Sequence, residues 1–128
     1  MRFVLDTHSF LWFGFGDTRL SPLARTLIAD PANEPVLSVA SLWEMAIKVS
    51  TGKLQLTRPY PIWVADQLSQ QNAVLLHVEL DDTVVVAELP YHHRDPFDRM
   101  LVAQALVRHL PIVSADTVFD SYGVARLW

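Results

Sequence analysis

The chain has 128 residues, 51% of them hydrophobic, with no cysteine and a formal net charge of −4. These values fit a single globular domain, residues 1–128, exclude disulfides and thiolate metal sites, and argue against nucleic-acid binding through basic side chains alone. No apolar run is long enough to span a membrane and the N-terminus lacks a signal-peptide layout, so we expect a cytoplasmic protein.

Short apolar segments alternate with helical patterns along the chain. The predicted strands are Phe3–Leu5, Val36–Val39, Ala73–His77, Ile112–Ser114 and Val124–Leu127. The predicted helices run up to Phe15, over Pro22–Ala29, from Ser38 or Ser41 to Thr51, and over Ile62–Gln70, Asp81–Leu89 and Phe97–Leu110. This alternation predicts an α/β fold with three layers, α/β/α: a short, mostly parallel sheet of four to five strands with helices on both faces.

The predicted helix Phe97–Leu110 has strong start signals and an unusually apolar surface. Asp95 is a good N-cap, Pro96 suits the first helical position, and Asp98 is an acid in the first turn. Asp98 either satisfies this helix terminus or lines a functional site. The apolar remainder needs cover on more than one side, from neighbouring helices or from a second subunit.

Four acids occupy comparable places relative to the predicted strands. Asp6 follows the first strand, Asp116 follows the fourth, and Glu44 and Asp98 lie in the first turns of helices. In a parallel sheet the carboxyl ends of the strands share one edge, where open α/β folds bind ligands. We therefore expect these four carboxylates to converge at that edge.

Each acid also has a purely structural interpretation. Asp6 and Asp116 are possible N-caps. Glu44 is able to close a capping box with Ser41 or to pair with Lys48. The apolar stripe that begins at Leu42 lies opposite Glu44, so periodicity alone favours a solvated Glu44.

A convergent set of four carboxylates has a definite chemistry. The anions repel one another, and some take up protons unless cations neutralise them. Hard oxygen ligands select Mg²⁺ or Mn²⁺, which keep several waters and reach substrate phosphates. Such ions activate a water for in-line displacement at a phosphodiester, so the pattern indicates a metal-dependent phosphoesterase or nuclease.

Three segments carry a family resemblance that extends from Phe3 to Asp116. They are FVLDTHSFLW, SVASLWEMAIKVSTGKL, and HHRDPFDRMLVAQAL together with IVSAD. The sequence resembles PIN-domain ribonucleases of the VapC type, the toxins of type II toxin–antitoxin pairs. The resemblance implies a PIN-like fold and carries the acidic quartet of the family over to Asp6, Glu44, Asp98 and Asp116. Asp6 and Asp98 would be the principal Mg²⁺ or Mn²⁺ ligands, and Glu44 and Asp116 would complete the cluster directly or through water.

The same resemblance implies a function and a set of partners. It implies an endoribonuclease that cuts RNA, forms a homodimer and is inhibited by a small cognate antitoxin. Operator DNA would be bound only through the antitoxin, and no membrane is involved.

Several further side chains near the acids are candidates for weaker roles. Lys48, Arg99 and His8 are candidate substrate contacts, and Arg94 is a further cation near the cluster, although surface ion pairing explains such cations equally well. The pair His92 and His93 does not form a zinc site by spacing, because adjacent histidines point in different directions and no second pair exists.

Two competing functions remain open from the residues alone. The first is a non-catalytic interaction module that keeps the fold and binds a partner through its apolar helices. The second is a phosphoacceptor, either a receiver domain or a phosphatase with an aspartate after the first strand. The phosphatase class requires a second aspartate at position 8, where this chain has histidine. The receiver requires a lysine after a late strand, which Ser114-Ala115-Asp116 does not provide.

Overall fold

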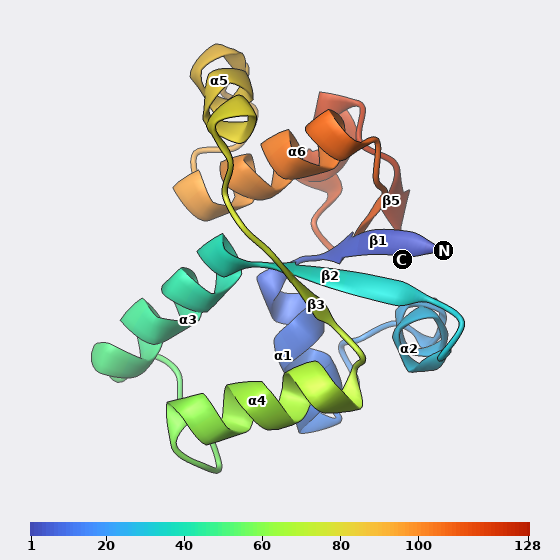
Figure 1. The fold of residues 1–128 in the computed structure, drawn as a ribbon, viewed down its shortest axis with the longest axis vertical. Helices are drawn as coiled ribbons and strands as arrows, with labels where there is room; N and C mark the ends of the chain where they lie inside the picture. Colours follow the sequence, from blue (N-terminus) through green and yellow to red (C-terminus); the bar gives the residue numbers. More distant parts are fainter.

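A five-stranded parallel sheet forms the centre of the computed structural model, which describes residues 1–128 (Figure 1). The strand order is β3-β2-β1-β4-β5, and every neighbouring pair is parallel. The strands are β1 (Arg2–Leu5), β2 (Glu34–Ser38), β3 (Val74–Leu76), β4 (Ile112–Val113) and β5 (Arg126–Leu127). The predicted α/β class with a short parallel sheet is confirmed.

Seven helices surround the sheet in two layers. They are α1 (Thr7–Phe15), α2 (Pro22–Ala29), α3 (Val39–Ser50), α4 (Tyr60–Gln70), α5 (Leu80–Glu88), α6 (Pro96–Arg108) and the 3₁₀ helix η1 (Thr117–Tyr122). In Figure 1, α1, α2 and α4 lie on one side of the sheet and α5 and α6 on the other, whereas α3 extends from the end of β2. No helix is long and apolar enough to cross a membrane.

The pleat of the central strand divides the core between these layers. Phe3 and Leu5 point into a cluster with α1, α2 and α4, whereas Val4 points into a second cluster with α5, α6 and η1. Successive side chains of a strand face opposite sides of a sheet, and both faces of β1 are buried here. This is why the strand is a continuous apolar run rather than an alternating one.

Polar residues set the starts of most helices close to their predicted positions. Ser21 caps α2, and Ser38 rather than Ser41 caps α3, accepting from the backbone N–H of Ala40. Helix α4 begins at Tyr60, two residues before the predicted start, because Pro61 occupies its first turn. Helix α6 ends two residues before the predicted Leu110, because His109 takes the left-handed conformation with φ of 54°.

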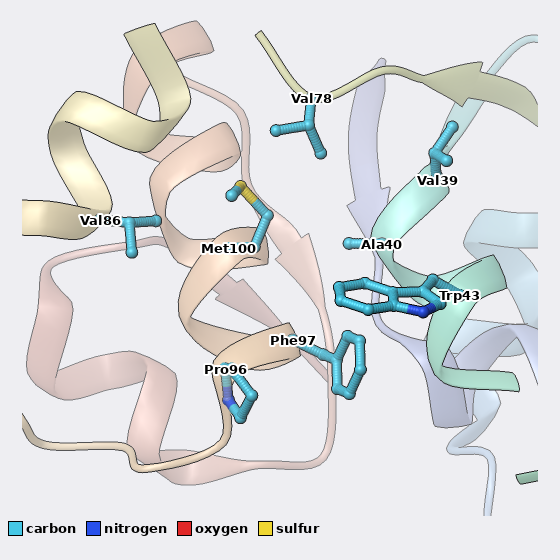
Figure 2. A pocket seen from close by; sticks show the side chains of 8 residues that line it. All are labelled: Val39, Ala40, Trp43, Val78, Val86, Pro96, Phe97 and Met100. Atoms are coloured by element: carbon cyan, nitrogen blue, oxygen red, sulfur yellow. The ribbon is translucent and has the colours of Figure 1, made fainter. Parts of the chain in front are cut away.

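The cover that α6 requires comes from within the chain. Leu101, Val102, Ala103 and Ala105 are buried against the sheet and η1, and α5 packs along the same helix. One apolar surface remains open beside it, a cavity of about 500 Å³ that we call the apolar pocket. It is lined by Val39, Ala40, Trp43, Val78, Val86, Pro96, Phe97 and Met100 (Figure 2).

Candidate functional site

Asp6 lies at the carboxyl end of β1 and caps α1. One oxygen, Oδ1, accepts from the backbone N–H of Ser9 at 2.7 Å, and Oδ2 accepts from the hydroxyl of Ser114. The residue is 6% exposed. Burial raises the pKa of Asp6, although the bonds from Ser114 and Ser9 oppose the rise. The N-cap role is therefore real, and it holds this carboxylate at the edge of the sheet.

Glu44 reaches the same region from α3 and is buried. Its Oε1 accepts from the Thr7 hydroxyl at 2.7 Å, and its Oε2 accepts from Lys48 Nζ at 2.9 Å. The expected pair with Lys48 is present, but the solvated face that periodicity favoured is wrong, since Glu44 is only 7% exposed. Helix α3 contacts both α1 and α6, so more than its apolar stripe is covered.

Asp98 lies in the first turn of α6, where a different acid serves as the cap. Asp95 Oδ1 accepts from the backbone N–H groups of Phe97 and Asp98, so the Asp98 side chain is left for other contacts. Burial, together with the nearby negative charges of Asp95, Glu44 and Asp6, raises the pKa of Asp98 to about 7, and His93 opposes the rise. Asp98 therefore lies in the same electrostatic cluster as Asp6 and Glu44.

Asp116 joins the cluster from the start of η1. Its Oδ1 accepts from the backbone N–H of Val118 at 3.0 Å. The Ser114 hydroxyl links two of the acids, because it donates to Asp6 and accepts from the backbone N–H of Asp116 at 3.0 Å. The structure thus brings together acids from four segments that are far apart in the sequence.

His93 lies within this cluster, which the sequence did not predict. Its Nε2 is 2.8 Å from Asp116 Oδ2 and 3.0 Å from Asp98 Oδ2. Its Nδ1 accepts from the backbone N–H of Asp95 at 3.2 Å, so Nε2 carries the ring proton and donates to the carboxylates. One ligand atom from each of His93, Asp98 and Asp116 lies within 4.8 Å of the others. As expected for adjacent histidines, His92 points elsewhere and packs on Tyr122.

The signal for His93 was its place in the loop before Asp98. Its orientation depends on contacts that spacing cannot give: its backbone N–H donates to the hydroxyl of Tyr122 at 2.8 Å. Ser114 and Thr7 were missed for the same reason, since hydroxyl partners are set by tertiary packing. Both are buried beside the acids that they contact.

The three predicted substrate contacts have different surroundings. Lys48 is connected to the site by its hydrogen bond to Glu44. His8 is exposed on α1, two residues after Asp6. Arg99 does not face the cluster. It is 5% exposed, and its guanidinium donates to the carbonyl oxygens of Val86, Leu89 and Pro90.

The donor set suits a hard divalent cation. Carboxylate oxygens predominate, and burial raises the pKa of both Asp6 and Asp98, with neighbouring acids adding to the rise at Asp98. A bound cation of the Mg²⁺ or Mn²⁺ type relieves that cost and favours the ionised carboxylates. The His93 proton on Nε2 makes this ring a hydrogen-bond donor to the acids rather than a ready ligand.

Comparison with known proteins gives a consistent result for the whole chain. A model of the PIN domain matches residues 3–125. No match was found among curated proteins.

Several solved structures have a similar fold. VapBC2 from Rickettsia felis, bound to a DNA fragment from its promoter, has a chain with a TM-score of 0.74 and 15% identity, covering 99% of this chain and 98% of that one. VapBC-5 from Mycobacterium tuberculosis, a toxin–antitoxin system, has a chain with a TM-score of 0.62 and 23% identity, covering 98% of both. FitAcB from Neisseria gonorrhoeae has a chain with a TM-score of 0.63 and 18% identity, covering 100% of this chain and 97% of that one. At these identities the likeness concerns the fold.

Proposed function

The chain belongs to the PIN-domain family, and we propose that it is an Mg²⁺- or Mn²⁺-dependent endoribonuclease, the toxin of a toxin–antitoxin pair. The observation that carries the proposal is the convergence of Asp6, Glu44, Asp98 and Asp116 at the carboxyl edge of the sheet. Family membership supports a nuclease, and the hard oxygen donors support a divalent cation.

In the proposed reaction the side chains of the site would hold the cation and orient the RNA. Asp6 and Asp98 are the principal ligands, and Glu44 and Asp116 complete the set directly or through water. A bound Mg²⁺ or Mn²⁺ ion would supply charge neutralisation and an activated water for hydrolysis of the phosphodiester. Ser114 and His93 hold the carboxylates of Asp6, Asp98 and Asp116 in place. Lys48 contacts a phosphate oxygen while it limits the repulsion around Glu44.

The proposed partners follow from the solved relatives. One of these relatives is described as a toxin–antitoxin complex from Klebsiella pneumoniae, and another as FitAB bound to a DNA fragment. We propose that this chain forms a homodimer in the cytoplasm and is inhibited by a cognate antitoxin. Contact with operator DNA is made through that antitoxin.

A non-catalytic interaction module is the alternative, and the apolar pocket favours it. The pocket presents Trp43, 64% exposed, against the edge of the Phe97 ring at 5.2 Å between centroids (Figure 2). Such a surface suits a partner's apolar side chain. It does not account for four converging carboxylates, so we retain the nuclease as the conclusion.

Metal removal provides the direct test. Purified, antitoxin-free protein is expected to cleave cellular RNA with Mg²⁺ or Mn²⁺, to lose this activity in EDTA, and to regain it when the ion is restored. Gel analysis of total RNA measures cleavage, and titration calorimetry measures Mn²⁺ binding. A protein that cuts no RNA and binds no Mn²⁺ would be an interaction module.

His93 is expected to position the metal ligands rather than bind the ion. Replacement by alanine removes the donor to Asp98 and Asp116 and should weaken Mn²⁺ binding about 10- to 100-fold. Glutamine retains an N–H donor at a similar reach and should restore part of the affinity, measured by calorimetry. Pulsed electron paramagnetic resonance of the Mn²⁺ complex should detect no directly bound nitrogen. A bound nitrogen would make His93 a ligand.

A further inference from the structure

A second cavity lies beside the carboxylates and has a different character from the apolar pocket. It is a groove of about 250 Å³ between α1 and the end of α3. Three of its lining residues are cations, Arg19, Lys48 and Lys53, and no acid lines it. We call it the cationic groove. The chain has only ten lysines and arginines and a net charge of −4, so this concentration of positive charge is a local exception.

The cations of the groove differ in how far they are already neutralised. Arg19 pairs with Asp17, and Lys48 uses one bond to Glu44. Lys53 is exposed and forms no ion pair or side-chain hydrogen bond. The ammonium of a lysine has three donors, so Lys48 and Lys53 both retain capacity for an anion.

Aromatic rings line the groove between these charges. The His8 ring lies 5.4 Å from that of Trp12, and the Arg19 guanidinium lies 4.9 Å from the centroid of Trp12. His8 is exposed and Trp12 is half-buried, so part of this stack faces solvent. Cations that track a backbone, together with aromatic rings that accept a base, are the means by which proteins bind single-stranded nucleic acid.

The groove is continuous with the candidate site. His8 follows Asp6 by two residues on the first turn of α1, and Lys48 is bonded to Glu44. The apolar pocket has no charged lining residue and therefore cannot neutralise a phosphate. The cationic groove, unlike the apolar pocket, therefore offers a path for an anionic strand that reaches the carboxylates.

We propose that the cationic groove binds the nucleotide of single-stranded RNA next to the scissile phosphate. Lys48 and Lys53 contact its phosphates, and its base stacks on Trp12 and His8. This inference rests on the proposed ribonuclease function and adds where the substrate lies. An acidic peptide is the competing occupant of the groove, and the experiment below distinguishes it.

The test measures RNA binding apart from cleavage. A short fluorescein-labelled single-stranded RNA is titrated with the Asp98→Asn chain, and anisotropy gives the affinity over a range of salt concentrations. Adding Lys53→Gln should weaken binding about threefold to tenfold and make the logarithmic salt slope shallower by about 1. Adding Trp12→Leu should weaken binding about tenfold with no change in that slope.

Arg2→Gln is the matched control, because it removes one positive charge at the amino end of β1, the opposite edge of the sheet. It should leave both affinity and slope unchanged. Circular dichroism checks the fold of each variant. Because Lys53 is exposed, the Lys53→Gln variant still tests the proposal if Trp12→Leu unfolds.

The outcomes separate this inference from the proposed function. The first outcome is that the wild-type chain cuts RNA, while Lys53→Gln and Trp12→Leu change neither RNA binding in the Asp98→Asn background nor cleavage when Asp98 is present. The groove is then not the RNA path. If these variants instead weaken only the binding of an acidic peptide, the groove is a protein-docking site. If the wild-type chain neither binds nor cuts RNA, both proposals fail together.

Discussion

Replacement of Asp98 by asparagine is expected to reduce RNA cleavage by about a thousandfold or more while leaving the fold intact. The change keeps the shape of the side chain but removes a charged metal ligand. Metal-ion stabilisation of the transition state is worth several kcal/mol, and each 1.36 kcal/mol is a factor of ten in rate. Cleavage rates with saturating Mn²⁺ measure the loss, and calorimetry should show weaker Mn²⁺ binding. Undiminished cleavage would remove Asp98 from the site.

The same substitution lowers activity but should raise the stability of the metal-free protein at pH 8. The pKa of Asp98 is raised to about 7 in the folded protein, from an ordinary value of 3.8. The stability associated with its protonated form is complete below about pH 4 and is lost as the pH rises towards 7. Metal-free wild-type protein should therefore lose stability over this range, and the Asp98→Asn variant should lose less and be the more stable at pH 8. The physical reason is that asparagine brings no charge into this buried position or beside the acids Asp95, Glu44 and Asp6.

Urea unfolding in EDTA at pH 5 and pH 8 measures this difference. The exposed Asp81 on α5 provides a matched control, since Asp81→Asn makes the same chemical change away from the cluster. Equal pH profiles for wild type and Asp98→Asn would show that the charge of Asp98 carries no penalty in the metal-free fold.

Replacement of Arg99 by methionine is expected to lower the free energy of unfolding by about 3 kcal/mol. The methionine keeps apolar volume but leaves the carbonyl oxygens of Val86, Leu89 and Pro90, of which that of Leu89 is in a buried bond, without their charged donor. The ring of Tyr91 also loses a guanidinium 3.9 Å from its centroid. Urea unfolding measures the change.

Arg94 supplies the comparison for that experiment. It lies in the loop just before α6, is exposed and forms no ion pair, so Arg94→Met should change stability by no more than about 0.5 kcal/mol. If Arg99→Met is as stable as the wild type and instead loses RNA binding, Arg99 is a substrate contact, as its position in the sequence first suggested.

The sequence was sufficient to predict where Asp6 and Asp116 lie at the edge of the sheet, because each of these acids follows a short apolar strand. Strand ends and parallel pairing are local and topological regularities, and they place two acids without knowledge of packing. The capping role of Asp95 was accessible for the same reason, and it left Asp98 free to be considered for a site.

The burial of Glu44 could not be predicted, because helical periodicity identifies the most apolar face of α3 but not how many neighbours the helix has. Contact with both α1 and α6 buries a side chain that the pattern placed in solvent. His93 and Arg99 show the same limit in loops and at helix starts. The direction of the His93 side chain follows from Asp116, 23 residues later, and that of Arg99 from three carbonyl oxygens 9 to 13 residues before it. Spacing in the sequence identifies neither partner.

The Ser114 hydroxyl that joins Asp6 to Asp116 has a consequence for the synthesis of the protein. Ser114 follows Asp6 by 108 residues, and β1 pairs with β4 only when both strands have been synthesised. A nascent chain that has not yet reached Ser114 and Asp116 therefore cannot complete the four-acid site.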